Sequence, residues 1–401
     1  DIIEKLEYFL ASQAKFLYAH VHKQAEKCLE LIQTKQTSTK IEICGDVRRM
    51  MPEVKGIELL SDAALVDIFP EIESMEYIDD QWYFMAIPIF IYVTESARFD
   101  QELFRLNSSE SFYAAFSNEE LSAGDDQLIF KNKGLPFIPA EFREHTDALS
   151  KNESYIQNLI EVEDIQGIVH NHSTYSDGLH TLKEMADYVR DSGFKYFVIS
   201  DHSKSAGYAS GLNEESVLMQ WNEIENLNNQ FADGFKIYKG IESDILTDGS
   251  LDYSDDILAG FDLVIASVHS VLNMDEEKAT RRLITAIENP YTRILGHPTG
   301  RLLLARRGYP VDYKKVIDAC ATNNVVIELN ANPQRLDLDW TWIPYALDKH
   351  VKVAINPDAH SKESIHYIKY GVAAARKGGL TKDMCLNTMN KEAFDQWLSR
   401  K

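Results

Sequence analysis

Cysteine is scarce in this 401-residue chain, and none of its cysteines stands in a Cys-x-x-Cys pair. The four are Cys28, Cys44, Cys320 and Cys385. Small secreted domains held together by disulfides use many more, at closer spacing. We therefore exclude a disulfide scaffold and expect a reducing, cytoplasmic setting.

Long hydrophobic runs are also absent. Ala86–Val93 holds eight residues, and Phe261–Val268 is interrupted by Asp262. A membrane-spanning helix needs roughly 18 apolar residues, so we expect no membrane partner. Residue 1 is Asp rather than Met, and no signal-peptide core follows it. We expect the chain to begin part-way into a longer protein.

Positive charge is in short supply. The chain has 41 Lys and Arg against 63 Asp and Glu, a net charge of −22. The deficit is −13 over residues 1–150 and −9 over residues 151–401. Proteins that bind long duplex DNA carry a basic surface for the phosphates. Any nucleic-acid role must therefore lie in a small, locally neutralised site.

The pattern of strand-like and helical segments divides the sequence into two regions, with the boundary between Glu144 and Asp164. We take residues 1–150 and 151–401 as the two domains. The first begins with apolar residues at helical spacing over Ile2–Leu31, which predicts an amphipathic helical pair. Strand-like runs follow at Lys40–Cys44, Ala63–Ile68 and Phe84–Val93.

The second region is more regular. Apolar strand-like segments end at His172, His202, Glu242, His269, His297, Asn330 and Asp358. Helical patterns lie between most of them, at Leu182–Asp191, Glu214–Gln230, Glu276–Ile287 and Tyr313–Thr322. Seven such β-then-α units predict an α/β fold with a parallel sheet or barrel. In a barrel, the loops after the strands build one shared pocket.

Nine side chains with metal-binding chemistry follow these strands: His170, His172, Asp177, His202, Glu242, His269, His297, Asp358 and His360. Strand periodicity places His170 and His172 on one face, and likewise Asp358 and His360 if the strand persists that far. One ion needs three or four ligands, so nine suffice for two or three ions. Imidazole with carboxylate favours Zn, Mn or Fe.

Such a cluster suits hydrolysis of a phosphoester by metal-bound hydroxide, because paired cations stabilise both the attacking and the leaving oxygen. Asp201 and His202 are candidates for proton transfer, although Asp201 is better placed to support the site from behind it. Lys204, Arg301, Arg306 and Arg335 lie near strand ends. Two interpretations stay open for these four: phosphate ligands, or solvated loop cations.

Six motifs resemble the PHP (polymerase and histidinol phosphatase) domain, and more closely the PHP domain at the C-terminus of bacterial family X DNA polymerases. They are His170–Gly178, Ile199–Ser203, Gly240–Leu246, Ala266–Ser270, Gly296–Arg301 and Asn356–His360. Glu328–Pro333, Arg335–Asp337 and Tyr370–Gly378 resemble the same subgroup. The resemblance covers nearly all of residues 165–401.

The resemblance implies a distorted (β/α)7 barrel with up to three divalent ions, Mn²⁺, Zn²⁺ or Fe²⁺. One ion would take His170, His172, Glu242 and Asp358; a second would share Glu242 and add His269 and His297; the third would take Asp177, His202 and His360. The activity implied is a metal-dependent phosphoesterase, in this subgroup a manganese-dependent 3′–5′ exonuclease acting on DNA 3′ ends, single-stranded or nicked.

The first region resembles the palm of the same polymerases, in a degenerate form. Gly45–Arg49 and Gly56–Glu58 match the palm motif with three replacements. Asp46 stands in place of the nucleotide-binding Ser. Gly56 stands in place of the first metal-binding Asp, and Glu58 in place of the second metal-binding Asp. The run Ile87–Val93, where a third acid is expected, has none. Two-metal transfer needs these carboxylates. We expect the first region to be a smaller α+β nucleotidyltransferase-like palm/thumb region without polymerase activity. We expect the lyase-like and helix-hairpin-helix domains of the family to lie upstream of this chain or to have been removed from it.

Three functions are compatible with this sequence. The subgroup resemblance and the polymerase-like first region favour a DNA 3′-end phosphodiesterase. The acidic composition favours a small-molecule phosphomonoesterase of the histidinol-phosphatase type, because a small phosphate ester needs no basic groove. The complete ligand set speaks against the third, a non-catalytic metal-binding module.

Overall fold

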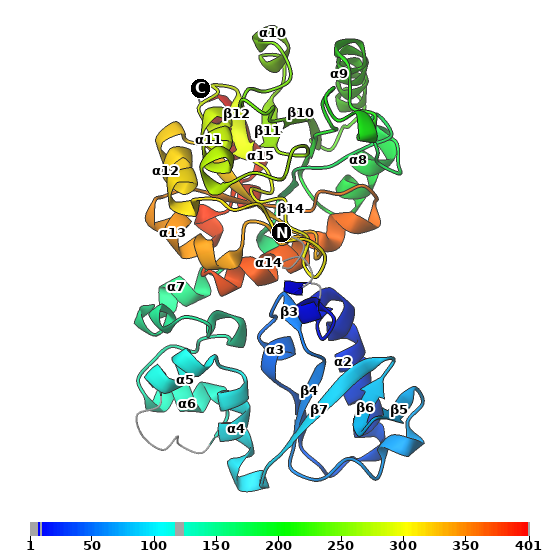
Figure 1. Ribbon diagram of the computed structural model, residues 1–401, viewed down its shortest axis with the longest axis vertical. Helices are drawn as coiled ribbons and strands as arrows, with labels where there is room; N and C mark the ends of the chain where they lie inside the picture. Colours follow the sequence, from blue (N-terminus) through cyan, green and yellow to red (C-terminus); the bar gives the residue numbers. More distant parts are fainter. Residues whose placement is uncertain (1–6, 9, 117–123, 400–401) are drawn as a thin grey trace. The chain divides into compact units, whose positions relative to one another are not determined.

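A computed structural model describes residues 7–8, 10–116 and 124–399 of the chain. The chain forms two compact units, one of residues 1–159 with 303–306, the other of residues 160–302 with 307–401 (Figure 1). Each unit has hydrophobic clusters of its own. Within the described residues no helix is long and apolar enough to cross a membrane.

The first unit is built on a five-stranded sheet with the order β2-β4-β7-β6-β5. Helix α2 buries Val21, Ala25, Cys28 and Ile32, which form one face of the predicted amphipathic pattern. The predicted pattern also includes residues 1–6 and 9, which lie outside the described residues. The elements are β1 Phe16–Leu17, α2 Tyr18–Lys35, β2 Ile41–Ile43, α3 Gly45–Arg48, β3 Glu53–Val54, β4 Ile57–Ser61, β5 Met75–Ile78, β6 Gln81–Phe84, β7 Ile87–Val93, α4 Phe99–Leu106, α5 Glu110–Phe116, α6 Asp126–Asn132 and α7 Glu153–Gln157.

The predicted strand at Ala63–Ile68 is wrong, since these residues form a turn after β4. The Ser61 hydroxyl donates to the Ala63 carbonyl at 2.7 Å and accepts from the Ala63 amide at 3.2 Å. Local side-chain bonds of this kind compete with strand pairing. The chain then enters a 3₁₀ turn at Phe69–Glu71, whose Pro70 has no amide proton to donate to a sheet.

The second unit contains seven parallel strands in the order β8-β9-β10-β11-β12-β13-β14 (Figure 1), which confirms the predicted barrel. The four predicted helices match α8, α9, α11 and α12 to within two residues. The elements are β8 Gly167–Ile168, α8 Leu182–Asp191, β9 Tyr196–Ile199, α9 Glu214–Asn228, β10 Lys236–Asp244, α10 Asp255–Leu258, β11 Leu263–Ser267, α11 Glu276–Ile287, β12 Thr292–Leu295, α12 Tyr313–Asn323, β13 Val326–Asn330, α13 Ile343–Asp348, β14 Val353–Asn356, α14 Ile368–Lys377 and α15 Lys391–Ser399.

The barrel closes where β8 and β14 meet. Beyond the carboxyl ends of both strands, Asn171 and Ala359 form an isolated bridge, in which the His172 amide donates to the Ala359 carbonyl at 2.8 Å. Further down, the buried Asn387 side chain accepts from the Ile355 amide at 2.8 Å and donates to the Gly167 carbonyl at 3.3 Å. One bridge and one side chain therefore replace a full ladder.

The expected strand periodicity fails at this closure. Strand β8 ends at Ile168 and β14 at Asn356, so neither the pair His170 and His172 nor the pair Asp358 and His360 continues a strand. His170 has a φ of 63° and Asp358 a φ of 51°, the left-handed region that costs a non-glycine residue free energy. Two facing kinks, rather than an alternating strand, aim these side chains inward.

Candidate metal centre

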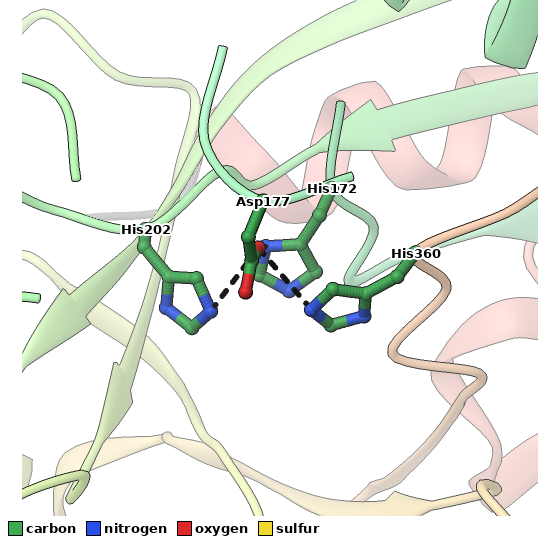
Figure 2. A group of neighbouring side chains, drawn as sticks. All are labelled: His172, Asp177, His202 and His360. Atoms are coloured by element: carbon green, nitrogen blue, oxygen red, sulfur yellow. Dashed lines mark ion pairs between the residues drawn. The ribbon is translucent and has the colours of Figure 1, made fainter. Parts of the chain in front are cut away.

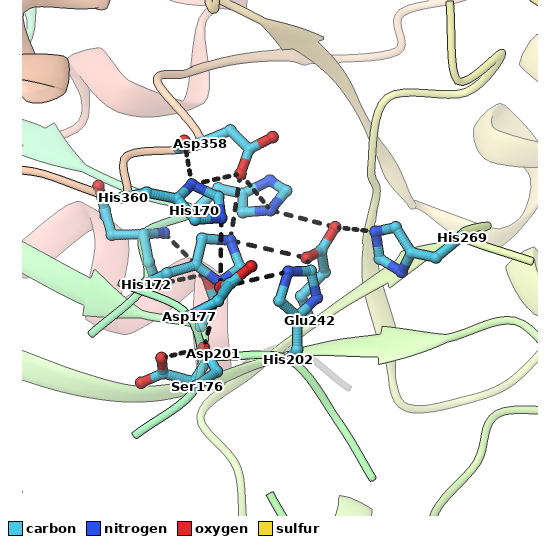
Figure 3. A network of polar contacts seen from close by, with 12 residues as sticks. His170, His172, Ser176, Asp177, Asp201, His202, Glu242, His269, Asp358 and His360 are labelled. Atoms are coloured by element: carbon cyan, nitrogen blue, oxygen red, sulfur yellow. Dashed lines mark hydrogen bonds and ion pairs between the residues drawn. The ribbon is translucent and has the colours of Figure 1, made fainter. Parts of the chain in front are cut away.

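All nine predicted side chains meet at the carboxyl end of the barrel; Figure 3 labels each of them except His297. They fall into four overlapping groups in which one ligand atom from each residue lies within 4.8 Å of the others. The groups are His172, Asp177, His202 and His360; His170, His297 and Asp358; His170, His172 and Glu242; and His202, Glu242 and His269. The structure therefore brings together residues from six of the seven strand ends.

Glu242, at the end of the long strand β10, is the centre of the cluster. Its Oε1 lies 2.9 Å from His297 Nε2 and 3.1 Å from His269 Nε2, and its Oε2 lies 3.0 Å from His202 Nδ1. The side chain is fully buried. Burial opposes its ionisation, but His269 and the other imidazoles outweigh this and hold the pKa of Glu242 well below its ordinary value. A buried carboxylate with both oxygens shared in this way is suited to bridging two cations.

Asp177 forms a second focus, on the open side of the cluster (Figure 2). Its Oδ1 lies 3.3 Å from His360 Nε2, 3.7 Å from His202 Nε2 and 3.8 Å from His172 Nδ1. The Asp177 side chain is 35% exposed, whereas His172 is fully buried. The cluster is therefore open to solvent on the Asp177 side.

The imidazoles differ in charge without metal. Burial and the neighbouring His360 and His202 lower the pKa of His172 to about 3. For His269, burial is outweighed by Glu242 and Asp244, which raise its pKa to about 10. Burial likewise opposes charging His360, but Asp177 and Asp358 raise its pKa to about 9. In the absence of metal, the protonated rings of His269 and His360 balance the negative charge of the neighbouring carboxylates.

The cluster fits divalent ions on its own geometry. Five of its buried polar atoms make no hydrogen bond within the described structure: His170 Nε2, His172 Nδ1, His202 Nδ1, His297 Nδ1 and Glu242 Oε2. The first three lie 3.2, 3.8 and 3.0 Å from carboxylate oxygens of the same cluster, so they are held by ion pairs alone. A buried polar atom without a hydrogen bond costs about 1–3 kcal/mol, and a bound cation would offer these atoms a ligand bond. Imidazole and carboxylate donors are those that Zn, Mn and Fe accept.

Two supporting carboxylates escaped the sequence analysis. Glu328 Oε2 lies 2.6 Å from His170 Nδ1, and Asp244 Oδ1 lies 2.6 Å from His269 Nδ1. Such partners orient a histidine so that its other nitrogen faces the metal. The sequence contains a signal that could have identified Glu328, because this acid lies inside the apolar run of β13 and a buried charge requires a partner.

Asp201 lies behind the cluster, beneath the loop that carries Asp177. Its carboxylate accepts from the Ser173 amide and hydroxyl, both at 2.7 Å, from the Ser176 hydroxyl at 2.5 Å and from the Gln220 amide at 2.7 Å. Burial raises its pKa, although these donors oppose the shift. The arrangement orders the loop, which agrees with a supporting role better than with proton transfer.

Of the four candidate phosphate-binding cations, Arg335 lies at the cluster, with Nε 3.6 Å from Asp358 Oδ2. Arg301 is engaged by Asp339 at 2.5 Å and by the carbonyls of Arg335 and Leu336, so it holds the loop that carries Arg335. Lys204 pairs with Glu214 at 2.7 Å. Arg306 lies in the short stretch that groups with the first unit.

Two of the three degenerate positions of the first unit, Asp46 and Glu58, border a cavity of about 710 Å³. Glu58 is buried, and its carboxylate contacts Lys55 Nζ at 3.1 Å and accepts from the Tyr92 hydroxyl at 3.1 Å and the Asp46 amide at 2.8 Å. A Cβ at Gly56 would lie 2.3 Å from the Pro88 carbonyl oxygen. The backbone therefore leaves no room for an acidic side chain at position 56.

Comparison with known proteins agrees with this geometry. Residues 169–332 match the family model of the PHP domain. The DNA polymerase/3′-5′ exonuclease PolX of Bacillus subtilis is 43% identical over 275 residues, which cover 69% of this chain and 48% of that protein. The chain thus spans about half the length of that relative.

Shorter relatives match a smaller part of the chain. A probable phosphatase of Caldanaerobacter subterraneus is 30% identical over 179 residues, 42% of this chain and 68% of that protein. One from Thermoanaerobacter sp. is 29% identical over 231 residues, 55% of this chain and 89% of that protein. A solved histidinol phosphate phosphatase from Lactococcus lactis aligns with a TM-score of 0.41 at 18% identity, over 54% of this chain and 94% of that one.

Proposed function

Since this chain belongs to the PHP domain family, we propose that its second unit is a metal-dependent phosphoesterase that removes nucleotides from the 3′ ends of DNA, a 3′–5′ exonuclease. The observation that carries the proposal is the nine-residue cluster around Glu242, in which five buried ligand atoms make no hydrogen bond within the described residues. The similarity to a relative named as a polymerase and 3′-5′ exonuclease supports DNA as the substrate.

The cluster would hold up to three ions in three sets, two of which share Glu242. These sets are His170, His172, Glu242 and Asp358; Glu242, His269 and His297; and Asp177, His202 and His360. Divalent ions bound there supply an activated water and neutralise the charge on the phosphate. We infer Mn²⁺, Zn²⁺ or Fe²⁺ from the mixed imidazole and carboxylate donors.

The remaining residues position this machinery. Glu328 and Asp244 fix the rings of His170 and His269 through contacts of 2.6 Å. Asp201 orders the loop that presents Asp177. Arg335, beside Asp358, is placed to neutralise a phosphate oxygen of the substrate. Lys204, Arg301 and Arg306 have no part in this proposal.

We also propose that the first unit has no polymerase activity. The carboxylate of Glu58 already contacts Lys55 and Tyr92, and position 56 cannot accept an acid. Asp46 pairs with Arg49 at 2.5 Å, and strand β7 contains no carboxylate. Of the three positions at which the palm motif has a metal-binding acid, Glu58 is the one that carries a carboxylate, and this carboxylate is already paired. A single paired carboxylate is insufficient to hold the two cations that nucleotidyl transfer requires.

The test is a 5′-labelled primer–template incubated with Mn²⁺, with and without dNTPs. We expect a ladder of shortened primers, lost in His170→Ala and kept in His366→Ala, whose imidazole lies outside the cluster on Tyr188. Primer extension by the wild type would contradict the loss of polymerase activity. Full nuclease activity in His170→Ala would contradict the shared metal site.

A second candidate, a small-molecule phosphomonoesterase, is favoured by the charge distribution. The chain carries a net charge of −22, and Lys204 and Arg301 are committed to Glu214 and Asp339. A small phosphate ester needs no extended cationic surface. Intact DNA together with hydrolysis of p-nitrophenyl phosphate, lost in His170→Ala, would favour this candidate over the nuclease.

A further inference from the structure

Tyr208 is an exposed aromatic residue at the rim of the metal centre. Its side chain is 69% exposed. Its ring centroid nevertheless lies 5.9 Å from that of His202 and 6.3 Å from that of His269. Single exposed aromatics are common on protein surfaces, so the informative feature is the position of this one beside two residues of the cluster.

The loop that carries Tyr208 is held firmly. The Leu212 amide donates to the His202 carbonyl at 2.8 Å, so the loop leaves and rejoins the structure at one point. Asp252 Oδ2 accepts from the Ser203 hydroxyl at 2.7 Å and the Ser205 amide at 2.9 Å. The backbone at Gly211 is so close that a Cβ would lie 1.9 Å from the Ser203 carbonyl oxygen. The ring is therefore presented by a preorganised loop.

The ring of Tyr208 is the part of this loop that lies against the cluster, in T-shaped contact with the imidazoles of His202 and His269. Among the described residues the Tyr208 side chain makes these two ring contacts. What the site offers at this point is the flat, apolar face of the ring.

We propose that Tyr208 forms a base-binding subsite, in which the ring stacks on the nucleobase of the terminal nucleotide while its phosphate lies at the cluster. This inference rests on the proposed nuclease function. A nucleobase is the group of a DNA substrate that matches a neutral aromatic face, and stacking accepts all four bases. Tyr208 is thus a positioning residue that acts on binding rather than on the chemical step.

The test compares two 5′-labelled single strands that differ only at the 3′-terminal nucleotide, one normal and one abasic. Removing an aromatic stacking partner costs about tenfold in affinity. We expect Tyr208→Ala to raise KM about tenfold on the normal end, with kcat within about twofold, and to leave KM on the abasic end unchanged. Tyr208→Phe keeps the face of the ring and should behave as the wild type on both ends.

Leu179→Ala is the matched control, because Leu179 is 74% exposed in the loop after Asp177 but offers no aromatic face. It should treat the two ends as the wild type does. Bound metal, measured by mass spectrometry, should be equal in all variants. An equal loss on both ends in Tyr208→Ala, or a loss in Tyr208→Phe, would overturn the subsite alone. A wild type that degrades neither strand would overturn the nuclease and the subsite together.

Discussion

At the scale of single residues, the metal centre depends on carboxylates that do not face the substrate. Glu328 contacts His170 Nδ1 and also accepts from the His297 amide at 3.1 Å and from the Asn356 side chain at 2.7 Å. One buried acid thereby links three strand ends. Removing its charge should loosen the ligand rings without removing a ligand.

We predict that Glu328→Gln weakens Mn²⁺ binding about 10- to 100-fold, because a carboxylate partner makes the coordinating histidine more basic and fixes its orientation. Equilibrium metal titration measures the effect directly. Glu288→Gln, an exposed change at the end of α11, should bind as the wild type. Unchanged affinity in Glu328→Gln would show that His170 needs no such support.

Metal binding should release protons and strengthen with pH. The pKa values of about 10 for His269 and about 9 for His360 mean that both rings are protonated at pH 7.5 in the metal-free protein. His172, with a pKa of about 3, is already neutral. Ligand histidines must lose their protons, so the apparent affinity rises between pH 6 and pH 8. Calorimetric Mn²⁺ titrations in buffers of different ionisation enthalpy count the protons, and zero release would contradict this assignment.

At the scale of elements, the barrel depends on a weak join between β8 and β14. The two strands share a single bridge at the metal end, and Asn387 fills the gap below it. His170 and Asp358, whose left-handed backbones flank that bridge, are both placed in the cluster. The geometry that turns these side chains inward is thus stabilised by the surrounding barrel rather than by the strands themselves.

We predict that Asn387→Ala destabilises the second unit by about 1–3 kcal/mol, since it leaves the Ile355 amide and the Gly167 carbonyl buried without partners. Urea unfolding of the metal-free protein measures this loss. Asn323→Ala, on an exposed helix end, should change the free energy of unfolding by less than about 0.5 kcal/mol. Equal stability of both variants would mean that the join needs no side chain.

At the scale of the whole molecule, charge sets how DNA can be bound. The chain is strongly acidic, and Arg335 is the one of four candidate cations that lies beside the cluster. A single strand should therefore contact the protein through its terminal nucleotides, not along its length. If the proposed function holds, the binding energy should come from the metal centre and from stacking, with a small contribution from counterion release.

We predict a shallow salt dependence for the DNA substrate. Each phosphate neutralised on a single strand contributes a slope of about −0.7 to the logarithm of affinity against the logarithm of salt concentration. With one or two such contacts, the slope of log(1/KM) between 50 and 200 mM salt should be about −1. A slope steeper than about −4 would reveal an extended cationic surface and contradict the local site.

Several features could be predicted from the sequence because they depend on neighbours in the chain. Alternation of apolar strands with amphipathic helices such as α8 and α11 predicted the barrel, and the bounds of both helices agree with the prediction. The rule that parallel strands end at one edge predicted that His202, Glu242 and His269 would meet. The strand predicted at Ala63–Ile68 failed, because a local hydrogen bond outweighed apolar composition.

Other features were decided by contacts between residues far apart in the chain. The left-handed backbones of His170 and Asp358 depend on a bridge between segments nearly two hundred residues apart. Glu328 pairs with His170, and Arg301 pairs with Asp339, through contacts between different segments of the folded barrel. The sequence by itself determined which side chains reach the rim, because the alternation of strands with helices fixes strand direction and so brings the strand ends to one edge. The tertiary structure decided how His170 and Asp358 turn inward, which side chains share a partner and which, like Tyr208, stay exposed, because burial and pairing are properties of the packed molecule.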